Sequence, residues 1–112
     1  MARGVEQRKA PRSKVNVPAQ VRGGKGFFTH ARCMTLSPHG VEMLVDWPME
    51  LGASYRMTIE ITSQLSLSDV RGTCVRCLKV GAHYRSAVSF VNLDGPTFQA
   101  VALLCGSKAL AG

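Results

Sequence analysis

The chain has 112 residues, which is enough for one domain with its own core and leaves little room for a second. Its apolar share of 46% and charged share of 19% exclude a disordered chain. The longest apolar run, Ala100 to Cys105, has six residues and is too short to span a bilayer. No apolar stretch follows the charged N-terminus, so we expect no secretory signal and a cytoplasmic location.

The net charge of +7 is unevenly distributed along the chain. Eight of the fourteen lysines and arginines fall within the first 32 positions, where Glu6 is the sole acid. Such an arm indicates an anionic partner, or otherwise a solvated segment that aids solubility. Residues 1–14 are polar, lack periodicity and contain Pro11, which predicts a flexible basic arm ahead of a domain over residues 15–112.

The chain after the arm is a series of short segments that read as strands. Val15 to Val21 is the first, and Pro18 marks it as an edge strand or one with a bulge. Phe27 to Thr35 and Val41 to Asp46 follow, separated by the turn residues 37–40. The fourth strand has the clearest alternation, which places one face in the core: Tyr55, Met57, Ile59 and Ile61.

A long hairpin and a short helix complete the chain. Asp69 to Val80 and His83 to Asn92 form the expected hairpin, which turns near Gly81. The stretch from Asp94 to Phe98 contains Pro96 and is typical of a helix start. An apolar stripe would dock this helix on the sheet: Phe98, Val101, Ala102 and Cys105. The order predicts an all-β fold with a C-terminal helix, a six-stranded antiparallel barrel whose closure removes exposed strand edges.

Two short motifs occupy particular places on this scaffold. Arg8 and Arg12 stand four apart just before the first strand, and Thr35, Ser37 and Gly40 lie at the second turn. Together they resemble the PilZ family signature, RxxxR followed by (D/N)xSxxG, and the resemblance covers nearly the whole chain. It implies a PilZ-type β-barrel that binds cyclic di-GMP through these five residues, without enzymatic activity or a cofactor.

The chemistry of these residues agrees with what the resemblance implies. Cyclic di-GMP is a dianion with two guanines. A guanidinium binds phosphate through paired charge-assisted bonds, presents a forked donor to guanine O6 and N7, and stacks on a base. Lysine offers a point charge alone, which favours Arg8 and Arg12 over Lys9 and Lys14. A ligand held by these arginines would order the arm against the barrel.

The second motif supplies smaller contacts and one departure. Ser37 can bond to backbone or to ligand, and Gly40 permits a backbone angle or a close ligand approach that a side chain would block. Without the arginine pair, both would read as an ordinary turn. Thr35 stands where the family has Asp or Asn. Its single hydroxyl predicts weaker binding, because a lost hydrogen bond in a buried site costs about 1 to 3 kcal/mol.

Other signals carry less weight. Cys74 and Cys77 have CxxC spacing, but positions three apart in an extended strand point to opposite faces, and a second ligand pair is missing, so we expect no metal site. Cys33 and Cys105 are expected to be buried thiols. The chain contains no hydrolase, P-loop or paired-carboxylate motif, which argues against an enzyme.

Three functions follow from the sequence. The first is a cyclic di-GMP receptor that alters its contact with an effector protein, without membrane insertion. The second is a degenerate PilZ adaptor that has lost the nucleotide, which Thr35 favours and the arginine pair opposes. The third, a barrel that binds RNA or single-stranded DNA, is disfavoured because few aromatic residues are available for stacking. Trp47, in a loop with proline, is expected to cover the barrel end or to mark a partner surface.

Overall fold

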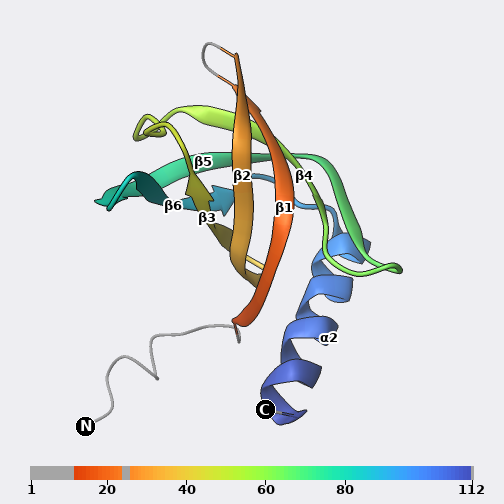
Figure 1. Cartoon of the computed structure of the whole chain (residues 1–112). Coiled ribbons are helices and arrows are strands. Elements are labelled where there is room, and N and C mark those ends of the chain that lie inside the picture. The colour runs from red at the N-terminus through yellow and green to blue at the C-terminus, as the bar shows by residue number, and fades with distance from the viewer. Residues whose placement is uncertain (1–11, 24–25, 112) are drawn as a thin grey trace, which may run out of the picture.

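The computed structural model describes residues 12–23 and 26–111, and these form a closed antiparallel barrel with a helix at one end (Figure 1). The strand order around the barrel is β1-β2-β3-β6-β5-β4. The elements, in chain order, are β1 (Ser13–Gly23), β2 (Gly26–Ser37), β3 (Gly40–Val45), β4 (Ser54–Glu60), β5 (Ser66–Val80), β6 (His83–Phe90) and α2 (Gly95–Ala111). The six strands and the terminal helix confirm the predicted fold class.

Period-two alternation decides which side chains enter the barrel. In β4 and just after it, the predicted inward residues Tyr55, Met57, Ile59 and Ile61 are all buried. In β6, Ser86 and Val88 are buried and their same-face neighbours Tyr84 and Phe90 pack against the core. The alternation therefore predicted the inner face of both strands correctly.

The first strand begins two residues before its expected start. Ser13 pairs with Leu36 and is buried, so the strand already runs along β2 at that point. Pro18 pairs with Arg32 of β2, whereas the pairing of β1 with β4 begins at Ala19. Proline thus stands where β1 has one neighbouring strand among the described residues, in agreement with an edge position.

The helix α2 closes one end of the barrel (Figure 1). Asp94 caps it: its carboxylate accepts bonds from the Thr97 hydroxyl (2.7 Å) and from the Thr97 N–H (3.2 Å). These bonds lower the pKa of Asp94. Val101 and Cys105 are fully buried against the barrel, and the Cys105 thiol donates to the Leu36 carbonyl at 3.2 Å. No helix in the described part of the chain is long and apolar enough to cross a membrane.

Candidate functional site

A surface pocket of about 350 Å³ lies where Arg12, just before β1, meets the β2–β3 turn and residues 75–76 of β5 and 87–89 of β6. The pairing of Ser13 with Leu36 brings Arg12 beside this turn, so a residue from the start of the described chain joins the pocket. The wall of the pocket contains hydroxyl groups, two arginines, one histidine, one carboxylate and small apolar side chains. The lining residues are Arg12, Thr35, Ser37, His39, Gly40, Val41, Glu42, Val75, Arg76, Ala87, Val88 and Ser89.

The β2–β3 turn is held by its own short side chains. The Ser37 hydroxyl accepts a bond from the His39 N–H (3.2 Å) and contacts the Gly40 carbonyl at 3.5 Å. The His39 carbonyl accepts from the Phe90 N–H at 2.8 Å, and the His39 ring meets Phe98 edge-on with centroids 5.6 Å apart. The turn is therefore fixed to both the end of β6 and the start of α2.

Gly40 lies where the backbone of β6 approaches β3 closely. Its φ is not in the left-handed region, so the turn does not need glycine for a special backbone angle. Instead, a Cβ at this position would overlap the carbonyl oxygen of Val88. Of the two alternatives expected for Gly40, the special backbone angle is wrong, and the close approach of a ligand stays a prediction.

Two β-bulges turn pocket residues outward. In β2, Cys33 pairs with Met43 of β3, and Thr35 pairs with the adjacent residue of β3, Glu42. Met34 is therefore an additional residue of β2 without a partner in this pairing. In β5, Cys74 pairs with Val88 and Arg76 pairs with Ala87, so Val75 is extra. An extra residue reverses the side on which the following residues point. Each bulge therefore brings a polar residue, Thr35 or Arg76, onto the outer face beside the pocket.

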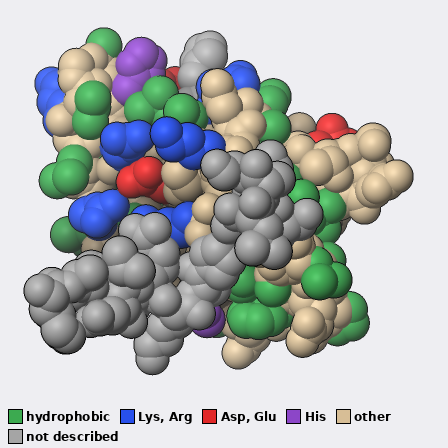
Figure 2. Space-filling model, turned by 90° about the horizontal axis from the view of Figure 1, so that it is seen from below, with side chains coloured by type: hydrophobic (Ala, Val, Ile, Leu, Met, Phe, Trp, Pro, Cys, Tyr) green, Lys and Arg blue, Asp and Glu red, His purple; other side chains and the backbone are tan. Residues whose placement is uncertain are grey.

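The charges around the pocket are predominantly positive. Glu42, whose side chain is 17% exposed, binds Arg76 (Nη2 to Oε2, 3.2 Å) and lies 3.6 Å from Nε of Arg85. Arg12 lines the same pocket, and Lys14 pairs with Thr35 on the neighbouring strand. Seen from below, basic side chains gather around an acidic one on one face of the barrel (Figure 2). The described part of the pocket thus suits an anion.

Four of the five predicted site residues line this one pocket: Arg12, Thr35, Ser37 and Gly40. Arg8 lies outside the described residues. The role of all five in binding a ligand stays a prediction. Sequence reasoning missed Glu42, Arg76 and Ser89 as wall residues. No motif marks them, and the bulge at Val75 conceals the direction of Arg76.

The positions of Cys74 and Cys77 show that one prediction was wrong. Cys74 and Cys77 were expected on opposite faces, yet they pair with Val88 and Ser86, which share the inner face, because Val75 is an extra residue between them. Cys74 is buried and Cys77 packs against the core. Burial, reinforced by the nearby Cys105, raises the pKa of the Cys33 thiol to about 12. Within the described ranges, no group of three or more side chains of metal-binding type comes together.

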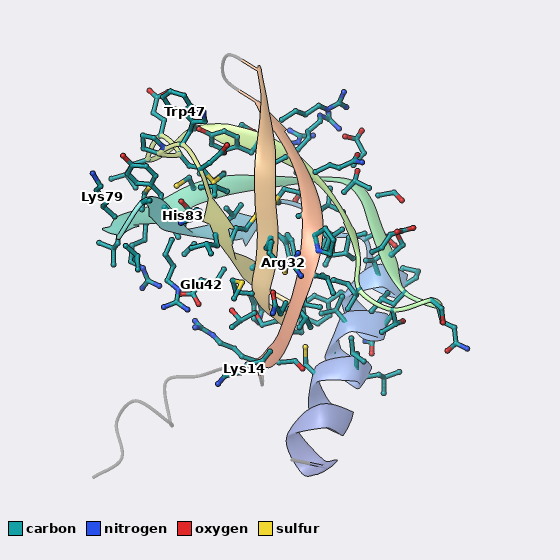
Figure 3. All side chains as sticks on the ribbon, in the orientation of Figure 1. Lys14, Arg32, Glu42, Trp47, Lys79 and His83 are labelled. Atoms are coloured by element: carbon teal, nitrogen blue, oxygen red, sulfur yellow. The ribbon has the colours of Figure 1, made fainter. Side chains whose placement is uncertain are left out.

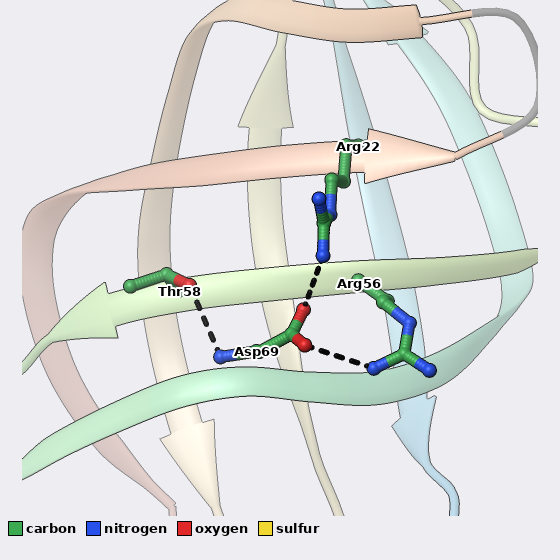
Figure 4. Close-up of polar contacts among 4 residues, drawn as sticks. All are labelled: Arg22, Arg56, Thr58 and Asp69. Carbon is green, nitrogen blue, oxygen red and sulfur yellow. Dashed lines mark hydrogen bonds and ion pairs between the residues drawn. The ribbon is translucent and has the colours of Figure 1, made fainter.

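A second polar cluster lies on β1, β4 and β5 (Figure 4). Asp69, in the left-handed region with φ of 52°, accepts bonds from Arg22 (2.9 Å) and Arg56 (3.0 Å), while its N–H donates to the Thr58 hydroxyl at 3.0 Å. The Arg22 bond is the main cause of the lowered pKa of Asp69. Because one carboxylate already serves both guanidiniums, this cluster is a weaker candidate for an anion site.

Comparison with known proteins identifies the domain type. The family model "PilZ domain" matches residues 6–106. The solved structure titled "Structure of Bacillus subtilis Inhibitor of motility (MotI/DgrA)" is similar to the chain with a TM-score of 0.80 and 13% sequence identity. The match covers 94% of this chain and 52% of that protein, so the chain spans about half of its length. No curated protein matches the chain in a sequence search.

Proposed function

The chain belongs to the PilZ domain family, a family of non-catalytic receptor modules, and from that premise we propose that it is a receptor for cyclic di-GMP. The observation that carries the proposal is the single pocket into which Arg12, Thr35, Ser37 and Gly40 converge. These residues come from two motifs more than 20 positions apart in the sequence.

The pocket offers a place for each part of the ligand. Arg12 is exposed, so its guanidinium can form charge-assisted bonds with a phosphate or a forked pair with guanine O6 and N7. Ser37 keeps acceptor capacity after its bond with the His39 N–H. The Glu42 carboxylate lies opposite Thr35 on the next strand. It therefore lies across from the position where the family has Asp or Asn, and it can accept from guanine N–H groups.

The size of the pocket bears on the proposed signal. A volume of about 350 Å³ is at the low end of ligand sites, which span roughly 300 to 1,000 Å³. A dinucleotide would therefore keep part of its surface outside the described wall. In our proposal Arg8 and the rest of the arm cover that part, so that binding orders the arm and changes the surface seen by an effector protein.

The alternative, a PilZ adaptor without nucleotide, is favoured by one observation. Glu42 already binds Arg76 and stands near Arg85, so a carboxylate occupies the wall that a dianion would approach. Its charge opposes binding of phosphate, and Thr35 offers one hydroxyl in place of the family's planar group. In this case the barrel would serve protein contacts alone.

Calorimetric titration with cyclic di-GMP decides between the two. We expect saturable binding that weakens by about ten- to a hundredfold in Arg12→Ala, because a hydrogen bond to a charged group contributes about 1.5 to 3 kcal/mol. Arg71→Ala, an exposed arginine of β5 outside the pocket, is the matched control and should bind like the unmodified chain. Arg8→Ala tests the arm in the same way, and GTP tests selectivity.

Two outcomes would contradict the receptor. Absence of binding up to millimolar nucleotide would leave the adaptor as the function. Equal loss of affinity in Arg12→Ala and Arg71→Ala would show that overall charge, and not the pocket, attracts the ligand.

A further inference from the structure

Large apolar side chains are exposed mainly at one end of the barrel. Six are exposed in the described part of the chain, and five of them lie on the loop after β3 or on the C-terminal part of β5: Trp47, Leu51, Val75, Leu78 and Val80. The sixth, Leu103, lies on α2. Trp47, Lys79 and His83 are found at the same end of the molecule in Figure 3. Clustered exposure of this kind is typical of an interaction surface.

The loop that carries Trp47 and Leu51 is held in place by hydrogen bonds. The Tyr55 hydroxyl accepts from the Glu50 N–H at 2.9 Å, and the Ala53 N–H donates to the Glu50 carbonyl at 3.1 Å. The Gly52 N–H then donates to the Cys74 carbonyl at 2.8 Å, which fixes the loop beside β5. The exposure of these two side chains is therefore a property of an anchored loop.

The same end of β5 has an edge without a neighbouring strand. β4 pairs with β5 as far as Thr73, and the loop residues Gly52 and Ala53 extend this contact to Cys74. Beyond that point, Arg76–Val80 pairs with β6 alone among the described strands, and Val75 is the extra residue of the bulge. Such an edge presents a row of backbone N–H and C=O groups that an added strand can pair with.

The charge beside this edge indicates which kind of strand could pair with it. Arg76 and Lys79 lie within Val75–Val80, which contains no acid. Glu42 of β3 binds Arg76 and also lies near Arg85. This one carboxylate therefore offsets only part of the positive charge that Arg76, Lys79 and Arg85 place on β5 and β6. A second copy of the chain would bring four cations and no acid onto the shared edge. Like charges across paired strands are destabilising, which disfavours self-association.

We propose that Val75–Val80 is a docking edge for an extended, acidic segment of a partner protein, which adds a strand to the barrel beside β5. Leu78 and Val80 pair with Arg85 and His83 and so share the outer face of the hairpin. Alternate apolar side chains of the incoming strand would rest on them, and its acids, which point to the other face, would meet Lys79, which pairs with Tyr84. Trp47 and Leu51 extend the apolar surface on the anchored loop.

The docking edge adjoins the pocket. Val75 and Arg76 belong both to the pocket wall and to this edge, and Val75 is the extra residue of the bulge. A ligand in the pocket would touch the strand on which the partner docks. The docking edge itself rests on pairing, exposure and charge in β5, and it stands whether or not the chain binds nucleotide.

Fluorescence anisotropy with a labelled probe peptide tests the proposal in the absence of nucleotide. The probe alternates glutamate and valine over about six residues, the usual length of a strand. We expect saturable binding that Leu78→Glu weakens by at least about tenfold, because it places a charge against the apolar face of the probe and adds a negative charge beside its glutamates. Leu103→Glu is the matched control, since Leu103 is even more exposed (72% against 54%) but lies on α2. Thermal unfolding of both variants verifies that they fold.

Two modified probes distinguish a strand from other modes of contact. A probe that is N-methylated at alternate residues keeps its side chains but loses backbone donors, and it should bind far more weakly. A probe with lysine in place of glutamate should also lose affinity. Undiminished binding of the methylated probe would overturn strand addition.

The remaining outcomes also decide the matter. No saturable binding of the glutamate–valine probe, or equal loss in Leu78→Glu and Leu103→Glu, would overturn the docking edge. Sedimentation that reveals a dimer of the unmodified chain, abolished by Leu78→Glu, would assign the edge to a second copy and overturn the acidic partner. A failure to bind cyclic di-GMP would leave the peptide result unchanged, so the two proposals fail separately.

Discussion

Gly40→Ala tests how closely β3 approaches β6 at the pocket. The added Cβ would overlap the carbonyl oxygen of Val88, a backbone atom that cannot rotate away. Val88 is 2% exposed and pairs with Val41, so a shift of β6 disturbs both the core and the strand pairing. Forcing one extra carbon into such a position costs about 1 to 3 kcal/mol. For a domain of this size, the melting temperature should fall by roughly 4 to 24 °C.

Gly95→Ala is the matched control, because nothing lies within 4 Å of the Cβ that it would add. Its melting temperature should stay within about 4 °C of the unmodified chain. Circular dichroism melts of the three proteins provide the measurement. If Gly40→Ala unfolds at the unmodified temperature, the approach of the two strands is not tight and the role of Gly40 lies elsewhere. Ligand titrations of this variant must be done where it remains folded.

Three further changes have defined outcomes. Thr35→Asn introduces the planar group of the family pattern and should tighten nucleotide binding by up to about a hundredfold; unchanged affinity would place that side chain away from the ligand. The Cys33 thiol is buried and its pKa is raised to about 12, so it should react with iodoacetamide at pH 8 far more slowly than the half-buried Cys77. Peptide mass spectrometry measures the two labelling rates, and earlier labelling of Cys33 would contradict its burial. The hydrogen bond from Arg22 lowers the pKa of Asp69 below its ordinary 3.8, so the stability that this pair contributes is present at neutral pH and is lost on acidification below that value. Asp69→Asn should flatten this part of the curve of unfolding free energy against pH. An unchanged curve would mean that the pair contributes nothing to stability.

Much of the fold could be predicted from the sequence because alternation and turn residues act locally. Tyr55 to Ile61 alternates without interruption, and its inward residues are those that the structure buries. Asp94 and Pro96 mark the start of α2 by capping chemistry that requires no tertiary contact. Where local preferences agree with the fold, element type and inner face follow directly.

The composition of the pocket was predictable only in part. Arg12 and the Thr35–Gly40 turn could be singled out because they stand in motifs, and the structure brings them to one pocket. Glu42 and Arg76 stand in no motif, and they reach the pocket through strand register. Register depends on where extra residues are inserted, which neither composition nor alternation reveals.

The bulge at Val75 explains both the missed wall residue Arg76 and the mistaken cysteine geometry, and the bulge at Met34 acts in the same way on Thr35. In each bulge a cysteine points into the barrel, and its thiol donates to the carbonyl oxygen of the residue two positions later. The distance is 3.5 Å both from Cys33 to Thr35 and from Cys74 to Arg76. Strict alternation would direct Thr35 and Arg76 into the barrel, where an arginine would be costly to bury. The extra residues Met34 and Val75 reverse that direction and place a hydroxyl and a guanidinium on the same outer face. The pocket therefore owes its polar wall to the local departures from regular pairing. A deletion of Val75 should remove the bulge, leave Cys74 and Arg76 paired with Val88 and Ala87, and keep Arg76 on the outer face, so the barrel should remain folded. Loss of the folded barrel in a thermal melt of that deletion would refute the assignment of Val75 as the extra residue.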